Sequence, residues 1–186
     1  IDGGCNLISQ HADSLGAPTA CENAKVPNVS YNGSTKEAGP NTYIISSRIN
    51  WAPYYQYAIQ CVIDGKAIDA DWTGTLATGS VVLTELNTDV AAEGTAEAIE
   101  AATAKLESGE LHVFDCSTFT VKGENLTPYM ADVDTDEAFT PDTEVIKDGY
   151  FAESEFRSAP YFDLLIDGIN LVNRVFSPDD VTDDDF

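Results

Sequence analysis

Short apolar runs that stop at polar clusters organise the first part of the chain. Residues 6–9 form such a run, polar residues follow it, and small residues fill positions 15–24. This order predicts a buried strand, a polar loop and then a helix capped by Asp13 or Ser14. The chain is therefore expected to begin with a strand–loop–helix unit.

Polar side chains at the end of that strand are candidates for ligand contacts. Gln10, His11 and Asp13 come directly after the apolar run. Loops and helix N-termini converge at the carboxyl ends of strands in an α/β sheet, and ligands bind there. We therefore expect these three side chains to contact a small polar molecule.

The same arrangement recurs further along the chain. Residues 26–32 predict a short strand that ends in a turn at Asn32, Gly33 and Ser34. Residues 42–47 are rich in β-branched side chains and predict a third strand. Successive strands with polar exits predict an α/β fold whose parallel sheet has a ligand-binding edge.

Aromatic and aliphatic residues then recur at helical spacing. Large apolar side chains between residues 51 and 65 fall on one face of a helix, with Pro53 in its first turn. Core packing is the expected role of Tyr54 and Tyr55. Trp51 lies at the strand–helix junction, where its ring either stacks on a planar ligand or packs at a hinge.

The second half of the chain carries further elements. Alanine-rich sequence favours a long helix, and alternating apolar residues favour strands. We expect a strand at 80–86, a helix at 90–108, a hairpin of 112–116 with 119–123, and a closing apolar segment at 167–176.

An acidic stretch near residue 134 is a candidate metal-binding loop. Asp132, Asp134 and Asp136 have the spacing that begins a calcium-binding loop. Glu137 stands where that loop requires glycine, and Thr143 stands where it requires glutamate. The sequence therefore predicts neither a metal site nor a cofactor.

Composition narrows the classes of partner. The 186 residues suit one domain or parts of two, and 43% are hydrophobic, enough to bury a core. A net charge of −23 argues against nucleic acid and anionic membranes as partners.

The chain opens at Ile1, which suggests a fragment or a processed product. Buried free thiols are the expected state of Cys5, Cys21, Cys61 and Cys116, although a disulfide is not excluded.

Catalytic motifs do not emerge from the sequence. The two histidines are His11 and His112, and no nucleophile elbow, P-loop, dinucleotide fingerprint or zinc-protease motif is present. His11 has Asp13 nearby, but a spacing of two residues does not make a triad. We therefore expect a protein that is not an enzyme, with catalysis by His11 and Asp13 as the alternative.

Five segments within about the first 115 residues carry a family resemblance. In chain order they are ISQHADS at 8–14, VSYN at 29–32, SRINWAPYY at 47–55, VIDGK at 62–66 and SGELHVF at 108–114. Together they resemble the basic membrane protein family of substrate-binding lipoproteins, a group that includes purine-nucleoside receptors of ABC importers.

The resemblance implies a type I periplasmic-binding fold, in which two α/β lobes joined by crossing strands clamp the ligand. It also implies that the chain is the C-terminal half of such a protein. The implied organisation places residues 1–50 in one lobe, 51–78 in the other, a return strand, helix and hairpin at 79–123, a C-terminal extension at 124–178 and an acidic tail at 179–186.

The resemblance also implies a set of ligand contacts. Asn32 and Ser34 fall near the position where the family commonly has a carboxylate that binds the ribose, and both residues are neutral here. Asn50 falls near a lysine of some members, and its amide can donate and accept toward a purine edge. The implied set is Gln10, His11, Asp13, Asn32, Ser34, Asn50 and Trp51.

The expected function is therefore that of a solute-binding component of an ABC importer. The resemblance implies that it binds a purine nucleoside or nucleobase between two lobes and delivers it to a permease. Its partners would be that permease and the missing N-terminal half of the same protein, which would anchor it by lipid at the outer face of the membrane or leave it periplasmic. A ligand-sensing module of the same fold and a protein for a sugar-like solute are the alternatives.

Overall fold

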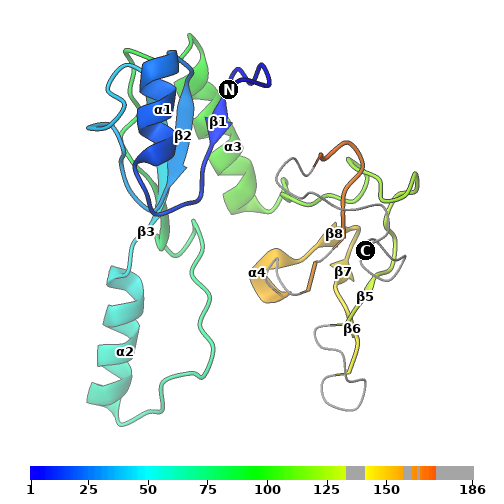
Figure 1. The fold of residues 1–186 in the computed structure, drawn as a ribbon. Helices are drawn as coiled ribbons and strands as arrows, with labels where there is room; N and C mark the ends of the chain where they lie inside the picture. Colours follow the sequence, from blue (N-terminus) through cyan, green and yellow to red (C-terminus); the bar gives the residue numbers. More distant parts are fainter. Residues whose placement is uncertain (133–140, 157–160, 163, 171–186) are drawn as a thin grey trace. The chain divides into compact units, whose positions relative to one another are not determined.

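The computed structural model describes residues 1–132, 141–156, 161–162 and 164–170. The chain forms two compact units, Ile1–Glu110 and Leu111–Phe186. In Figure 1 the first unit carries the longer helices and the longest strand, and the second unit carries short strands and a short helix. Each unit is described separately below.

The first unit is an α/β structure built on one four-stranded sheet. The strand order is β1-β2-β3-β4, in which the first three strands run parallel and β4 runs antiparallel to β3. The predicted α/β class with a parallel sheet is thus confirmed. Its elements are β1 (Ile8–Ser9), α1 (Gly16–Ala24), β2 (Asn28–Tyr31), β3 (Tyr43–Ile49), α2 (Ala52–Asp64), β4 (Val81–Leu83) and α3 (Thr95–Ser108).

Polar side chains fill much of the interior of this unit. Asn28, Thr42 and Ser46 are buried along the two central strands and the turn that leads into β3. The Asn28 Nδ2 donates to Thr42 Oγ1 at 3.1 Å, and the buried Asn87 Nδ2 donates to the Tyr43 carbonyl at 2.8 Å. These bonds tie the loops to the sheet, because a buried polar group is costly unless it is paired.

Helix α1 starts without the predicted side-chain cap. Its N-cap position is Leu15, and no side chain caps the helix there. The Ser14 Oγ accepts the Gly16 N–H at 3.4 Å but does not occupy the N-cap position, so the cap expected from Asp13 or Ser14 was wrong. The helix end is better defined, because Lys25 adopts a left-handed conformation with φ 59° and its N–H satisfies free carbonyls of the last turn.

Helix α2 has the predicted bounds but not the predicted burial. Pro53 lies in its first turn and Gly65 ends it with φ 66°. Tyr54 is half-buried, as expected for packing, whereas Tyr55 is 58% exposed, so its predicted core role was wrong. The rest of that face is also open to solvent, with Ile59, Val62 and Ile63 each at least 60% exposed. We call Tyr55, Ile59, Val62 and Ile63 the open face of α2.

The end of this unit departs slightly from the predicted bounds. The predicted strand at 80–86 is shorter and spans Val81–Leu83. The predicted helix at 90–108 begins only at Thr95, because Gly94 before it takes φ 83°, a left-handed conformation outside the helical range. The helix still ends at Ser108, as predicted, with Gly109 in a left-handed conformation.

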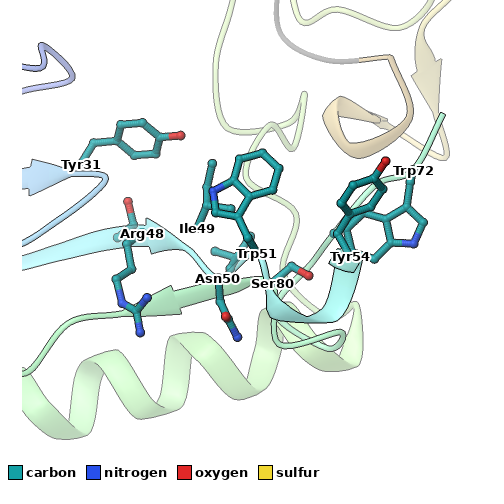
Figure 2. Close-up of a pocket in the computed structure, with 11 residues that line it drawn as sticks. Tyr31, Arg48, Ile49, Asn50, Trp51, Tyr54, Trp72 and Ser80 are labelled. Carbon is teal, nitrogen blue, oxygen red and sulfur yellow. The ribbon is translucent and has the colours of Figure 1, made fainter. Parts of the chain in front are cut away.

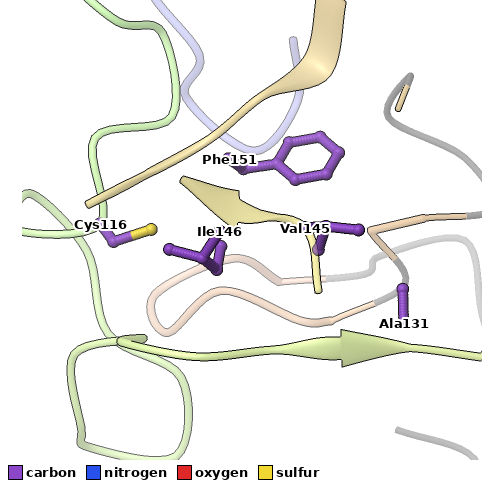
Figure 3. Close-up of a cluster of buried hydrophobic side chains, with 5 residues drawn as sticks. All are labelled: Cys116, Ala131, Val145, Ile146 and Phe151. Carbon is purple, nitrogen blue, oxygen red and sulfur yellow. The ribbon is translucent and has the colours of Figure 1, made fainter. Parts of the chain in front are cut away.

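The second unit is built around an apolar cluster. Cys116, Ala131, Val145, Ile146 and Phe151 are all buried and pack together (Figure 3). Short antiparallel pairs hold the backbone around the cluster. The described elements are β5 (Met130–Ala131), β6 (Thr143–Glu144), β7 (Ile146–Lys147), β8 (Tyr150–Phe151) and α4 (Glu153–Phe156).

The predicted hairpin of 112–116 with 119–123 was wrong. Those residues form turns, and Asp115 bridges Tyr150 instead. Side chains satisfy the backbone locally: Asp115 Oδ1 accepts the N–H and the hydroxyl of Ser117, and Asn125 donates to the carbonyls of Cys116 and Phe119. Such side-chain bonds compete with strand pairing.

Several predicted features lie wholly or partly outside the described residues. Most of the acidic stretch at 132–136 lies outside them, as do residues 171–176 of the closing apolar segment and the whole tail at 179–186. All four cysteines are free: Cys21, Cys61 and Cys116 are buried as expected, whereas Cys5 is exposed, contrary to prediction. Across the described residues, no helix combines the length and the hydropathy that crossing a bilayer requires.

Candidate functional site

Three neighbouring strands end beside one cavity. Ser9 ends β1, Tyr31 ends β2, and Ser47 lies in the second half of β3. The parallel pairing places Ser9 beside Val29 and Tyr31 beside Ser47. All three strands line a cavity of about 480 Å³, to which the loop after β1 adds Gln10 and His11. Ser9, Tyr31 and Ser47, where the sequence placed the three strand exits, therefore lie beside one cavity, although β3 continues to Ile49.

A second cavity shares Tyr31 and Ser47 with the first. Its volume is about 370 Å³, and its wall comes from the end of β3, the start of α2 and the returning chain before β4. Figure 2 shows the side chains of Trp51 and Tyr54 at the start of α2, with Trp72 beside Tyr54. Both tryptophans of the chain thus line this cavity.

The first cavity contains a pre-formed aromatic pair. The His11 and Tyr31 rings stack with centroids 4.4 Å apart and planes 14° from parallel. Because His11 is exposed, the outer face of this pair is open to solvent. A flat, amphipathic surface of this kind is suited to planar or ring-shaped ligands.

Gln10 is held by a short polar chain beside that pair. Its Nε2 donates to Ser30 Oγ at 3.4 Å, and Ser30 Oγ is 2.8 Å from Thr35 Oγ1. The other end of the amide, Oε1, is buried and accepts no hydrogen bond from any residue that the structure describes. The residue therefore has one tethered end and one unused acceptor.

Asn50 has a structural task that its sequence position did not reveal. Its Nδ2 donates to the Gly79 carbonyl at 2.9 Å, and its Oδ1 accepts the Ala52 N–H at 3.3 Å. Its backbone N–H donates to the Ser80 carbonyl at 2.7 Å. Asn50 thus links the end of β3 to the start of β4. A ligand that contacts Asn50 would share an amide that already makes two hydrogen bonds.

Trp51 is 55% exposed and sits where the chain turns from β3 into α2. Its ring lies 6.3 Å from the Tyr55 ring and is tilted by 31°. It lines the second cavity together with Ile49 and Val81. This placement fits the ligand-stacking alternative, since an exposed ring beside a cavity has a free face.

The sequence interpretation missed Trp72 and Gly74. The Trp72 ring packs 5.3 Å from the Tyr54 ring. The Tyr57 hydroxyl accepts the Asp69 N–H at 3.0 Å, and a hydrogen bond with the Asp69 side chain raises the pKa of Tyr57 to about 12. These contacts hold the returning loop against α2. A lone aromatic residue in an irregular stretch, two positions before a glycine, was the available signal.

Gly74 is the tightest point of this loop. A Cβ on it would lie 2.4 Å from Ser80 Cβ and 2.9 Å from an atom of the Trp72 ring. Real side chains do not approach so closely, so any larger residue would displace Ser80 or Trp72, and both line the second cavity.

Three expected site residues lie elsewhere. Asp13, Asn32 and Ser34 are exposed and line neither cavity. Asn32 takes φ 63° and donates its N–H to the Ser47 carbonyl at 2.7 Å. The Ser34 Oγ accepts the Lys36 N–H at 3.3 Å. Asn32 and Ser34 therefore shape the turn after β2.

The two cavities are unusual for such an acidic chain. The chain has 32 acidic residues, yet no Asp or Glu is among the residues that line either cavity in the described structure. Arg48 lines the second cavity, but its guanidinium points away from Trp51 in Figure 2. The described residues also contain no group of three or more His, Cys, Asp or Glu able to hold a metal ion. The polar groups of the site are mainly hydroxyls and amides.

Comparison with known proteins gives one curated relative. No protein-family model matches the chain. It is 31% identical over 120 residues to the putative ABC transporter glucose-binding protein TsgA13 of Haloferax volcanii, and the match covers 64% of this chain. The chain is similar to an ABC transporter solute-binding protein. The match covers only 30% of that relative's length.

The chain also has a weak similarity to a solved structure. An ABC transporter solute-binding protein from Conexibacter woesei has 23% identity and a TM-score of 0.47, over 60% of this chain and 38% of that one. Neither protein is named for purines or as a basic membrane protein.

Proposed function

We propose that this protein is the solute-binding component of an ABC importer. The observation that carries the proposal is the convergence of β1, β2 and β3 on two adjoining cavities that share Tyr31 and Ser47. Ligands of α/β sheets bind at such carboxyl edges, and ligand sites combine apolar walls with a few placed polar groups. The similarity to an ABC transporter glucose-binding protein supports the same role.

The proposed ligand is a purine nucleoside or nucleobase. The stacked His11–Tyr31 pair and the exposed Trp51 ring offer flat surfaces to a planar base. The resemblance to purine-nucleoside receptors supports this class. A sugar is the second candidate, because the curated relative is named for glucose. Aromatic walls and hydroxyl groups suit either ligand.

The proposal includes a second lobe. From Ile49 to Ile63 the sequence has no charged residue, although the chain carries a net charge of −23. The open face of α2 lies in this stretch. An exposed apolar patch usually marks an interface. We therefore propose that α2 belongs to the second lobe, where its open face packs against the N-terminal half of the same protein. The ligand would lie between the two lobes, and the assembly would dock on a permease.

Such a protein works outside the cytoplasmic membrane, and we propose a location at its outer face, lipid-anchored or periplasmic. No catalytic step belongs to this proposal, since the curated relative is named for binding a solute. His11 then acts as a ring for stacking on Tyr31.

Calorimetry on the full-length protein tests the ligand. Adenine, adenosine, guanosine, inosine and glucose would be titrated into the wild type and into Trp51→Ala. We expect heat from one class and a loss of affinity of about tenfold or more in Trp51→Ala, since a stacked aromatic contact contributes about 0.5–1.5 kcal/mol beyond the area that it buries.

The control is Leu15→Ala. Leu15 is a large apolar residue that is 59% exposed, similar to Trp51, but it lies outside the open face of α2 and lines neither cavity. It should keep wild-type affinity. Heat from glucose alone would replace the purine proposal with the sugar one, and no heat from any of the five solutes would overturn solute import of either kind.

A further inference from the structure

The unused acceptor of Gln10 differs from the other unpaired polar atoms of the structure. Among the described residues, Asn28 Oδ1 and Ser46 Oγ are also buried without a hydrogen-bond partner. Neither of these residues lines the two cavities, whereas Gln10 lines the first one. Of the three atoms, only Gln10 Oε1 thus belongs to a cavity-lining residue of this site.

In this structure the Nε2 end of the Gln10 amide faces Ser30, and the Oε1 end is left without a partner among the described residues. Ser30 Oγ receives the Nε2 end and is itself bonded to Thr35 Oγ1, so the tether runs from the amide into the loop after β2. Oε1 is the end left over. An unpaired buried acceptor costs about 1–3 kcal/mol, and a donor that arrives with a ligand recovers that cost.

The charge of the site limits what that donor can be. The described lining holds hydroxyl and amide groups but no carboxylate to pair with a cationic ligand. Burying a charge without a partner is far more costly than burying a paired hydroxyl or amide. The chain's net charge of −23 disfavours an anionic solute in turn, so the donor is an N–H or O–H of an uncharged molecule.

We propose that Gln10 sets the specificity of the site by accepting, at Oε1, a hydrogen bond from an N–H or O–H group of an uncharged ring-shaped solute. This rests on the proposed function and adds to it a charge class and a direction for one hydrogen bond. Adenine, guanosine and glucose all carry such donors, whereas a cationic solute such as spermidine does not fit.

Three variants of the full-length protein test the direction of this bond. Gln10→Met removes both polar ends at similar length. Gln10→Glu keeps acceptors at both ends and lets the Ser30 hydroxyl become the donor. Gln56→Glu makes the same chemical change at an exposed position on α2 outside both cavities, and it serves as the control for added charge.

Calorimetry with adenine, adenosine, guanosine, inosine, glucose and spermidine gives the readout. For a solute that the wild type binds, we expect Gln10→Met to weaken binding about 10- to 100-fold, since each 1.4 kcal/mol is tenfold. Gln10→Glu and Gln56→Glu should stay within about threefold of wild type, and spermidine should not compete.

The outcomes separate the two proposals. Equal losses in Gln10→Met and Gln10→Glu would show that keeping an acceptor at this position does not preserve affinity, and an unchanged Gln10→Met would show that Gln10 makes no contact with the ligand. Either result overturns this inference and leaves solute binding intact. Tight binding of spermidine would overturn the charge class. Absence of binding by the wild type to every probe would overturn solute binding and this inference together.

A ligand-free measurement provides an independent check. Relief of an unpaired buried acceptor predicts that Gln10→Met does not lower the thermal midpoint of the protein. A midpoint several degrees below that of Gln56→Glu would assign Gln10 a structural role and overturn the inference.

Discussion

The two units of this protein bury opposite kinds of side chain. In the first unit, buried residues include the polar Asn28, Ser46 and Asn87, while the aliphatic open face of α2 meets solvent. In the second unit, the described core is an apolar cluster around Phe151 and Val145. The second unit thus has its own hydrophobic centre, whereas the first leaves much of its apolar surface for something else to cover.

The two units are therefore stabilised by different kinds of interaction. Hydrogen bonds fix the loops of the first unit onto its sheet and contribute about 0.5–1.5 kcal/mol each. Apolar burial stabilises the second unit in proportion to the area removed from water. The open face of α2 remains exposed after the first unit has folded. An exposed apolar face of this kind is suited to bind a partner.

The largest expected effect is in the second core. Phe151 is fully buried and meets Phe114 and Phe162 at centroid distances of 5.8 and 5.0 Å. Phe151→Ala should destabilise this unit by about 3–5 kcal/mol, because it removes apolar contacts and leaves a cavity. Hydrogen exchange read by mass spectrometry should show faster exchange around β7 and β8, with β2 and β3 unchanged.

Val113→Ala serves as the control, because Val113 is 62% exposed in the same unit. It should leave exchange at β7 and β8 as in the wild type. Faster exchange throughout the first unit in Phe151→Ala would show that the two cores unfold together, and the contrast between them would then be lost.

A smaller effect is expected from the polar interior. The Asn87 Nδ2 donates to the carbonyls of Pro40 at 3.2 Å and Tyr43 at 2.8 Å. Asn87→Ala should cost about 1–3 kcal/mol, since it removes the amide that donates to the carbonyl of the buried Tyr43. Urea unfolding followed by circular dichroism would measure the change, with the exposed Gln60→Ala as control. A cost below that of Gln60→Ala would mean that the polar interior does not hold the first unit together.

The smallest effect is expected at the open face of α2. Ile59, Val62 and Ile63 are 60–71% exposed, so changing each to Gln should alter the stability of this chain by no more than about 0.5 kcal/mol. The same urea titration on the chain alone provides the measurement. A triple variant that lost several kcal/mol would show that the face is buried in solution, for example between two copies, and sedimentation velocity would then reveal dimers.

The sequence predicted the first unit better than the second for a physical reason. Local signals such as Pro53 and Gly65 define α2, so its bounds were found, and β-branched residues revealed β3, although this strand spans Tyr43–Ile49 and not the predicted 42–47. The burial of Tyr55 could not be read from the same pattern, because helical periodicity shows that a face is apolar and does not show what covers it. In the second unit, Asp115 and Asn125 redirected the backbone into turns, and a strand pattern cannot foresee such side-chain bonds.

The candidate site was predicted in the same uneven way. Gln10, His11, Asn50 and Trp51 lie at the two cavities because parallel strands bring their exits to one edge. Asp13, Asn32 and Ser34 lie outside the cavities, since short turns after β1 and β2 direct them to solvent. Trp72 reaches the site through a loop whose path depends on tertiary contacts with α2, which a linear sequence does not display.

The position of Trp51 and Trp72 has a practical consequence. Since these are the two tryptophans of the chain and both line one cavity, indole emission from this protein originates at the candidate site. A solute that enters the cavity would change the wavelength or the intensity of this emission, whereas motions confined to the second unit would leave it unchanged. The molecule thus carries a built-in optical reporter, which makes screening of unlabelled compounds possible without any dye.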